Sequence, residues 1–487
     1  MDDLLKIDAT EAARRVRERE TSAEALTALV LEQAEKTEPR VGAYLRLDLE
    51  GAIAQAKAID NAIGDGKQPG PLAGVPVAIK DNIHVEGQVT TCASKILGDF
   101  QAPYDATVVR RLREAGAIIV GKTNLDEFAM GSSCENSALQ QTHNPWDIAH
   151  VPGGSSGGSA ACVAAHSAFI SLGSDTGGSI RLPASFCGVV GYKPSYGRVS
   201  RYGLVAFASS LDQVGPFARS VRDVALSLKV MGGRDPMDST TPDREVPDYP
   251  SRLADNLKGK RVGVVRAYLD EMPNREVADA VSRAIDALKD LGAEIVDVEL
   301  PHAEYGIAVY YVVASAEASS NLARFDAVRY GMRKPADSLI DMYMQTRGEG
   351  FGPEVKRRIM LGTYALSAGH YDEFYGRAGK VRTLIARDFE KAFEKCDLIA
   401  GPCAPFTAFK SGEKSDPLSM YLCDVFTIPA SLAGLCALSL PVGFDGAGLP
   451  IGMHLQAPAY ADGELLSAAH ALEQQLKASV DRLPAIA

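Results

Sequence analysis

Three short segments of the sequence contain side chains that can serve in catalysis. Lys80 ends the apolar run Gly74–Lys80 (GVPVAIK), residues 152–159 read PGGSSGGS, and Asp175–Arg181 reads DTGGSIR. Serine hydroxyls and lysine amines become nucleophiles or bases when their surroundings activate them. Each segment is therefore a candidate catalytic site.

The DTGGSIR segment has the pattern of a sharp turn that exposes backbone N–H groups. The preceding residues, Phe169–Gly173, predict a strand, and the two glycines let the chain turn at once. Consecutive N–H groups aimed at one oxygen form an oxyanion hole. We expect Thr176, Gly177 and Gly178 to form this hole. Ser179, at the end of the turn, would be a nucleophile, although a plain strand-to-helix turn with a capping serine has the same pattern.

The glycine–serine stretch at 152–159 is open to several interpretations. A flexible linker has this composition, but the small-residue run that follows, Ala160–Ser174, lacks linker character. A glycine-rich turn leading into a helix instead presents N–H groups to an anion or a partly deprotonated hydroxyl. The lysine of a phosphate-binding P-loop is missing, so a nucleotide site is disfavoured.

Gly153–Gly157 also matches the G-x-S-x-G nucleophile elbow of α/β-hydrolases. That elbow follows a strand, yet Asn144–Val151 contains Pro, Asp and Asn. It also requires a downstream acid and histidine. None of the downstream histidines stands in a distinctive loop: His302, His370, His454 and His470. The elbow is therefore the weaker interpretation.

The elements around these segments alternate between strand and helix patterns, which predicts an α/β architecture. Predicted strands are Val75–Lys80, Ala117–Gly121, Arg261–Val265, Glu294–Val298 and Leu398–Gly401, and predicted helices are Ala106–Ala115, Val277–Leu291 and Val381–Lys395. The N-terminal region has a helical pattern, with Thr21 and Glu24 as a predicted capping box.

Composition and charge exclude several classes of protein. The 487 residues are 46% hydrophobic and 23% charged, as in ordinary globular proteins. The net charge of −11 disfavours a primary nucleic-acid binder, because phosphate binding depends on Lys and Arg. The eight cysteines include no C-x-x-C pair, which indicates a reducing cytosol without zinc or disulfides. No signal peptide is apparent, and the apolar stretch Thr427–Phe444 is interrupted by prolines, so we expect buried strands there.

Taken together, Lys80, Gly153–Ser159 and Asp175–Arg181 resemble, in order and spacing, the three motif elements of the amidase signature family. The resemblance extends from about residue 5 to residue 475. It implies an α/β fold with one large mixed β-sheet flanked by helices on both faces. An N-terminal helical segment at 1–65 would form a single compact unit with a catalytic domain at 66–487.

The family resemblance implies a Ser–Ser–Lys triad. Ser179 would attack a carboxamide carbon, Ser155, expected on a cis peptide bond, would relay the proton, and Lys80 would be the final base. A free lysine has a pKa of about 10.4, so Lys80 must be buried to be neutral near pH 7. A carboxylate opposes that shift, so we expect Asp81 to point elsewhere. An isolated lysine would instead form a surface salt bridge.

Within this family the chain resembles the A subunits of aspartyl/glutamyl-tRNA amidotransferases. Gly121–Pro145, Arg201–Pro216 and Arg357–Tyr371 carry the resemblance, although Cys134 stands where Thr is expected. The implied activity is hydrolysis of L-glutamine through a glutamyl ester, with ammonia used to amidate Glu-tRNA(Gln), Asp-tRNA(Asn) or both. The implied partners are the B and C subunits of a cytoplasmic heterotrimer. The B subunit would bind the charged tRNA and use ATP and Mg²⁺, and no cofactor is implied in this chain.

A glutamine site needs a cation for the α-carboxylate and an anion for the α-ammonium. By the same resemblance, Arg357 or Arg358, with Arg358 preferred, would clamp the carboxylate through two hydrogen bonds. Asp424 would hold the ammonium, and Tyr310 would line the pocket. A stand-alone amidase that acts on a small carboxamide is the alternative function. It would share the triad but lack the paired clamp of Arg358 and Asp424.

Overall fold

The protein is described by a computed structural model that covers residues 2–480 and 482–486. The strands are β1 (Tyr44–Leu47), β2 (Pro76–Lys80), β3 (Ile118–Thr123), β4 (Ile170–Asp175), β5 (Val190–Lys193), β6 (Gln213–Ala218), β7 (Arg261–Val264), β8 (Glu294–Asp297), β9 (Leu398–Pro402), β10 (Cys436–Phe444) and β11 (Pro450–Ala457). The helices are α1 (Ala9–Arg17), α2 (Ala23–Val41), α3 (Leu49–Gly64), α4 (Thr107–Glu114), α5 (Gly157–Ala164), α6 (Arg181–Cys187), α7 (Val221–Met231), α8 (Ala267–Asp270), α9 (Arg275–Asp290), α10 (Gly306–Asn321), α11 (Leu339–Gly350), α12 (Pro353–Ala365), α13 (Arg377–Lys395), α14 (Pro417–Tyr421), α15 (Ile428–Leu432) and α16 (Asp462–Val480).

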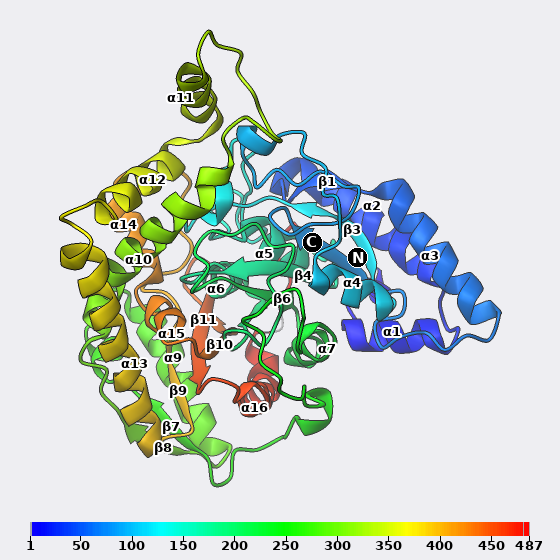
Figure 1. Ribbon diagram of the computed structural model, residues 1–487. Helices are drawn as coiled ribbons and strands as arrows, with labels where there is room; N and C mark the ends of the chain where they lie inside the picture. The colour runs from blue at the N-terminus through cyan, green and yellow to red at the C-terminus, as the bar shows by residue number, and fades with distance from the viewer. Residues whose placement is uncertain (1, 481, 487) are drawn as a thin grey trace.

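The strands form one 11-stranded mixed sheet in the order β1-β3-β2-β4-β6-β5-β10-β11-β9-β7-β8. β2 runs parallel to both β3 and β4, whereas β4 pairs antiparallel with β6 and β10 pairs antiparallel with β11. Neighbouring residues of β10 enter different hydrophobic clusters, Leu438 the largest one and Ala437 the second, so both faces of the sheet are covered. The expected α/β fold with a mixed sheet is confirmed (Figure 1).

The central parallel strands are buried on both faces, and this explains their sequences. Every residue of β2 and of β4 is buried. A strand covered on both faces gives a continuous apolar run rather than an alternation. The predicted strands therefore correspond to β2, β3, β7, β8 and β9, and the three predicted helices to α4, α9 and α13.

The first 65 residues combine helices with one strand. α1, α2 and α3 lie together at one side of the molecule, next to β1 and β3 (Figure 1). β1 pairs antiparallel with β3 and so extends the sheet at its edge. The predicted capping box at Thr21 and Glu24 is wrong by one position. Ser22 is the N-cap of α2, and its hydroxyl accepts the Ala25 N–H at 3.0 Å.

The apolar stretch Thr427–Phe444 is only partly strand. α15 occupies its first part, with Pro429 in the first turn, where the missing N–H costs no hydrogen bond. β10 follows and is buried at most of its positions. The prediction of strands throughout is therefore wrong for the first part and right for the second. Among the described residues, no helix is both long and apolar enough to cross a membrane.

α11 and α12 form an elbow at the edge of the molecule. α11 projects away from the body of the protein, and α12 returns to it beside α10 (Figure 1). The elbow is short, because α11 ends at Gly350 and α12 begins at Pro353. α12 carries both arginines that the sequence nominates for the substrate carboxylate.

Candidate active site

Parallel pairing places the ends of β2 and β4 at the same edge of the sheet. Ala78 lies beside Ser171 and Ile79 beside Leu172, so Lys80 at the end of β2 lies near Ser174 and Asp175 at the end of β4. Side chains at the carboxyl ends of parallel strands converge at one edge, which is the usual position of a site in such sheets. The glycine–serine stretch leads directly into α5 above this edge.

Lys80 is fully buried and is surrounded by hydroxyl groups rather than by a carboxylate. Its Nζ lies 2.8 Å from Ser155 Oγ, 2.8 Å from Ser156 Oγ and 2.9 Å from Ser174 Oγ. Burial lowers the pKa of Lys80 to about 7, although nearby acidic groups, Asp126 foremost, oppose the shift. Asp81 points elsewhere, as expected, because its carboxylate is 2.7 Å from Lys122 Nζ.

The hydrogen bonds around Lys80 favour one orientation of a neutral amine, which has two N–H groups and one lone pair. The Ser156 hydroxyl lies 3.2 Å from the Ser174 carbonyl and can give it its only proton, which leaves Ser156 Oγ as an acceptor. Ser174 Oγ already accepts from Asn82 Nδ2 at 2.9 Å. If Lys80 donates to Ser156 and Ser174, its lone pair is left for the hydroxyl proton of Ser155.

Ser155 and Ser179 lie on adjacent segments. The Gly154–Ser155 peptide bond is cis, as the resemblance led us to expect. The Ser156 N–H donates to the Ser179 carbonyl at 3.1 Å, which holds the two segments together. Among the hydrogen bonds of the described residues, none involves Ser179 Oγ and none joins it to Ser155 Oγ. The hydrogen bond between Lys80 and Ser155 in the predicted relay is therefore present. The bond between Ser155 and Ser179 is not formed, although their segments are adjacent. Catalytic hydrogen bonds often tighten only when substrate binds.

The turn from Thr176 to Ser179 is held by a buried ion pair. Asp175 and Arg181 are both fully buried, and Arg181 Nη2 lies 2.9 Å from Asp175 Oδ1. In the part of the chain that the structure describes, the N–H groups of Gly177 and Gly178 have no hydrogen-bond acceptor. These free donors are what an oxyanion hole requires.

The two glycines of the turn let the predicted binding residues approach closely. A Cβ at Gly177 would lie 2.8 Å from the ring of Tyr310, and one at Gly178 would lie 2.2 Å from Asp424 Oδ1. Any larger side chain at these positions would displace Tyr310 or Asp424. The structure thus brings both residues to the same turn as Ser179, although they come from distant parts of the chain.

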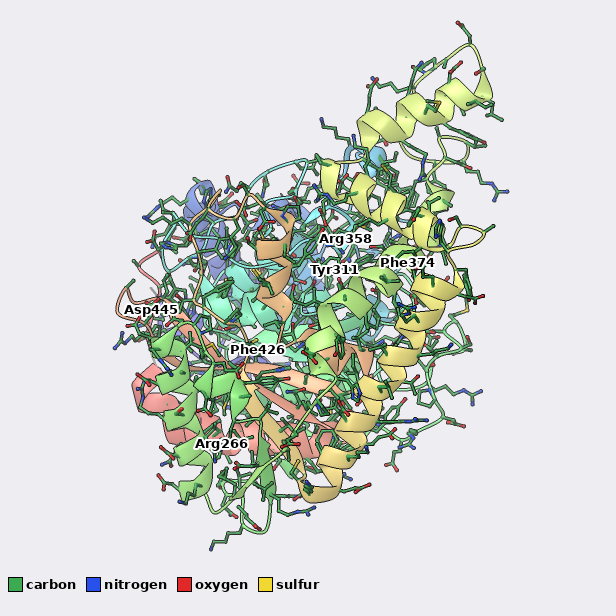
Figure 2. The ribbon with its side chains drawn as sticks, turned by 90° about the vertical axis from the view of Figure 1, so that its left-hand side faces the viewer. Arg266, Tyr311, Arg358, Phe374, Phe426 and Asp445 are labelled. Carbon is green, nitrogen blue, oxygen red and sulfur yellow. The ribbon has the colours of Figure 1, made fainter. Side chains whose placement is uncertain are left out.

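Arg358, and not Arg357, has an unsatisfied donor in the interior. Arg358 is 2% exposed and donates from Nε to Glu354 Oε1 at 2.7 Å, while its Nη1 has no partner among the described residues. Its guanidinium lies 4.4 Å from the centre of the Tyr311 ring, and Figure 2 shows the two residues together beneath α12. Arg357 is 42% exposed and pairs with Glu354.

Ser132 joins the site although no sequence pattern singled it out. Its hydroxyl donates to Asp424 Oδ2 at 2.6 Å, and it lines a cavity of about 240 Å³ that Arg358 and Tyr421 also line. Burial raises the pKa of Asp424 to about 7, against the effect of the Ser132 hydrogen bond. Ser132 lies within Gly121–Pro145, one of the stretches that resemble the amidotransferase A subunits, but nothing in that sequence distinguishes Ser132 from Ser133.

The sequence matches a known protein family. A family model described as Amidase matches residues 25–466. The chain belongs to the amidase family. Within it, the chain is 58% identical, over 97% of both chains, to the A subunit of a Glutamyl-tRNA(Gln) amidotransferase from Moorella thermoacetica.

Solved structures of amidase-family proteins share the fold. The crystal structure of the A subunit of Glutamyl-tRNA(Gln) amidotransferase from Thermotoga maritima is 44% identical, with a TM-score of 0.81 over 97% of this chain and 95% of that one. The native peptide amidase from Stenotrophomonas maltophilia is 32% identical, with a TM-score of 0.84 over 99% of both chains. Proteins named for different activities therefore share this fold, and the site residues must decide between those activities.

Proposed function

We propose that the chain is the glutamine-hydrolysing subunit of a tRNA-dependent amidotransferase. It supplies ammonia for the conversion of Glu-tRNA(Gln), Asp-tRNA(Asn) or both to the amidated form. The names of relatives that are 55–58% identical over nearly the whole chain support this proposal. The single observation that carries it is a buried lysine amine bonded to Ser155, beside a turn that Asp424 and Tyr310 contact.

In the first step, Ser179 Oγ attacks the side-chain carbonyl carbon of glutamine. The hydroxyl proton of Ser179 moves to Ser155 while the proton of Ser155 moves to neutral Lys80. The carbonyl oxygen takes the electron pair, and the N–H groups of the Thr176–Gly178 turn stabilise its negative charge. Lys80 then returns the proton through Ser155 to the departing nitrogen. The C–N bond breaks, and ammonia leaves a glutamyl ester on Ser179.

In the second step, water hydrolyses the ester along the same relay. Water gives its proton through Ser155 to Lys80 as its oxygen bonds to the ester carbon. The bond from carbon to Ser179 Oγ breaks, and Ser179 recovers a proton from the relay. Glutamate and ammonia are the products, so one glutamine and one water are consumed in each cycle.

Recognition of free glutamine is assigned to the two buried charges beside the turn. Arg358 has a spare Nη1 donor for the α-carboxylate, and Asp424 faces Gly178 as the acceptor for the α-ammonium. Tyr310 packs against Gly177 of the same turn. A stand-alone amidase for small carboxamides would have no use for a buried arginine and a buried aspartate at this position.

The remaining assignments concern the complex. The B and C subunits are the proposed partners in a cytoplasmic heterotrimer, with charged tRNA, ATP and Mg²⁺ bound mainly by the B subunit. The net charge of −11 is consistent with this division, because an acidic chain repels tRNA.

Two measurements test the proposal. The full-length chain, isolated from its native host, is expected to bring partner subunits with it and to release ammonia from L-glutamine much faster than from acetamide. A monomer that hydrolyses acetamide as well as glutamine would contradict the proposal and favour the stand-alone amidase.

A further inference from the structure

Two neighbouring carboxylates, those of Asp126 and Glu127, are buried beside the site. Their residues are 0% and 1% exposed, at the start of the short 3₁₀ turn Glu127–Ala129. Among the described hydrogen bonds, neither carboxylate contacts the amine of Lys80 or the hydroxyls of Ser155 and Ser179. Their hydrogen-bond partners lie on different segments, the loop at 134–136 for Asp126, and Ser94 with the start of α12 for Glu127.

Asp126 holds the segment that carries Ser155. Its N–H donates to the Ser155 carbonyl at 3.1 Å, and a Cβ at Gly154 would lie only 2.0 Å from Asp126 Oδ2. Of the carboxylates that raise the pKa of Lys80 against the effect of burial, Asp126, Asp175 and Asp212, Asp126 has the largest effect. Asp175 is neutralised by its ion pair with Arg181. Asp126 therefore fixes the relay serine and also contributes most to the negative potential at the amine.

The carboxylate of Asp126 also reaches toward the binding side. It accepts the N–H groups of Cys134 at 2.9 Å and Asn136 at 3.0 Å. These bonds fix the loop that carries Ser132, whose hydroxyl holds Asp424. Asp126 thus contacts both sides of the site, since its backbone N–H holds the relay serine and its carboxylate holds the loop that supports the proposed ammonium site.

Glu127 holds the start of the helix that carries Arg358. Its Oε2 accepts the Gly352 N–H at 2.8 Å, and Gly352 is the N-cap of α12. A Cβ at Gly352 would lie 2.4 Å from the same oxygen, so the contact depends on the glycine. The other oxygen of Glu127 bonds to the Ser94 hydroxyl. In the first turn of α12, Glu354 accepts a hydrogen bond from Arg358 and so fixes its guanidinium.

We propose that Asp126 and Glu127 are paired positioning residues that connect the proton relay to the amino-acid-binding helix. Asp126 holds the segment of Ser155 and contributes to the negative electrostatic potential at the Lys80 amine. Glu127 fixes the position of Arg358 through the start of α12. This inference rests on the proposed function.

The test compares Asp126→Asn and Glu127→Gln in the full-length chain, isolated with the subunits that copurify with it. Ammonia release from L-glutamine is followed against substrate concentration and pH. Asp126→Asn is expected to move the acid limb of kcat, measured at saturating glutamine where the bound ammonium keeps Asp424 ionised, to lower pH by about one unit, because Lys80 loses its main opposing charge. Glu127→Gln is expected to raise KM about fivefold to tenfold, through a displaced Arg358, and to leave the acid limb unmoved.

Asp223→Asn is the matched control. Asp223, on α7, is also a fully buried carboxylate that accepts hydrogen bonds from two backbone N–H groups. These are the N–H groups of Ala9 and Thr10, at the start of α1. Asp223→Asn is expected to change neither the acid limb nor KM. An unmoved acid limb in Asp126→Asn, an unchanged KM in Glu127→Gln, or the same changes in the control would each overturn the inference.

If Asp126→Asn does not fold, Glu127→Gln and Ser94→Ala decide the matter, and an unchanged KM in both overturns the inference. A wild-type protein that releases no ammonia from glutamine contradicts the proposed function itself. That failure is visible before any variant is compared.

Discussion

The two halves of the site are built in different ways. The proton-transfer half, Lys80 with its three serine neighbours, lies at the ends of β2 and β4 and in the loop before α5, is buried, and has the hydrogen bonds of Lys80 satisfied within the chain. The amino-acid half borders a cavity and contains a buried guanidinium with an unused donor, Arg358 Nη1. The hydrogen bonds of Lys80 are complete without a ligand, whereas Ser179 Oγ and Arg358 Nη1 have no hydrogen-bond partner among the described residues. Chemistry and recognition can therefore be disrupted separately.

Ser179→Ala gives the largest expected effect on the first half. Loss of the nucleophile is expected to reduce kcat for glutamine by a factor of about 10⁴ or more. The melting temperature is expected to stay near that of the wild type, because the Ser179 hydroxyl forms no described hydrogen bond in the fold. Ser227→Ala, which removes another buried hydroxyl, on α7, is the control and should keep full activity. Retained ammonia release in Ser179→Ala would remove Ser179 from the mechanism.

Two buried lysines on adjacent strands separate catalysis from stability. Lys80→Met is expected to lower kcat about 10³-fold, because the general base is lost. Lys122→Met leaves the buried carboxylate of Asp81 without its partner, and should lower the free energy of unfolding by about 3–5 kcal/mol. Its folded fraction should remain active. Urea unfolding and kcat are measured for both variants, and the reverse pattern would show that the roles were assigned wrongly.

The second half is tested by the two adjacent arginines of α12. Arg358→Lys is expected to raise KM for glutamine about tenfold to a hundredfold, because a lysine cannot form the same paired hydrogen bonds to a carboxylate. kcat should change much less. Arg357→Lys should leave KM within about threefold of the wild type, since Arg357 is partly exposed. Equal effects of the two substitutions would contradict the assignment of the carboxylate to Arg358.

The acid limb of the pH profile is the smallest expected effect and involves both halves. Lys80, with its pKa lowered to about 7, acts as a base only when neutral, and Asp424, with its pKa raised to about 7, binds an ammonium only when ionised. Both conditions fail as pH falls, so kcat/KM should decline below about pH 7 and more steeply than for one group. A profile that stays flat down to pH 5 would be inconsistent with both assignments.

The difference between the halves also explains what the sequence could predict. Lys80, Ser155 and Ser179 lie in short segments whose strand, turn and helix patterns are local, and pairing of β2 with β4 brings them together. Tyr310, Arg358 and Asp424 come from three separate elements. Only the family resemblance nominated them, because periodicity does not reveal long-range packing. Ser132 was missed for the same reason, since its role depends on Asp424, 292 positions away.

The shift of the α2 cap from Thr21 to Ser22 is a local error, because both residues are suitable N-caps.

The central claim is that Lys80 is a neutral amine near physiological pH. It is tested most directly by the pKa of its side chain, measured by NMR on protein labelled with ¹³C at the lysine Cε and assigned with Lys80→Met. The account predicts a titration close to pH 7, far below the value of about 10.4 for a free lysine. A titration near 10 would mean that Lys80 is charged under working conditions, and it would contradict the proposed relay.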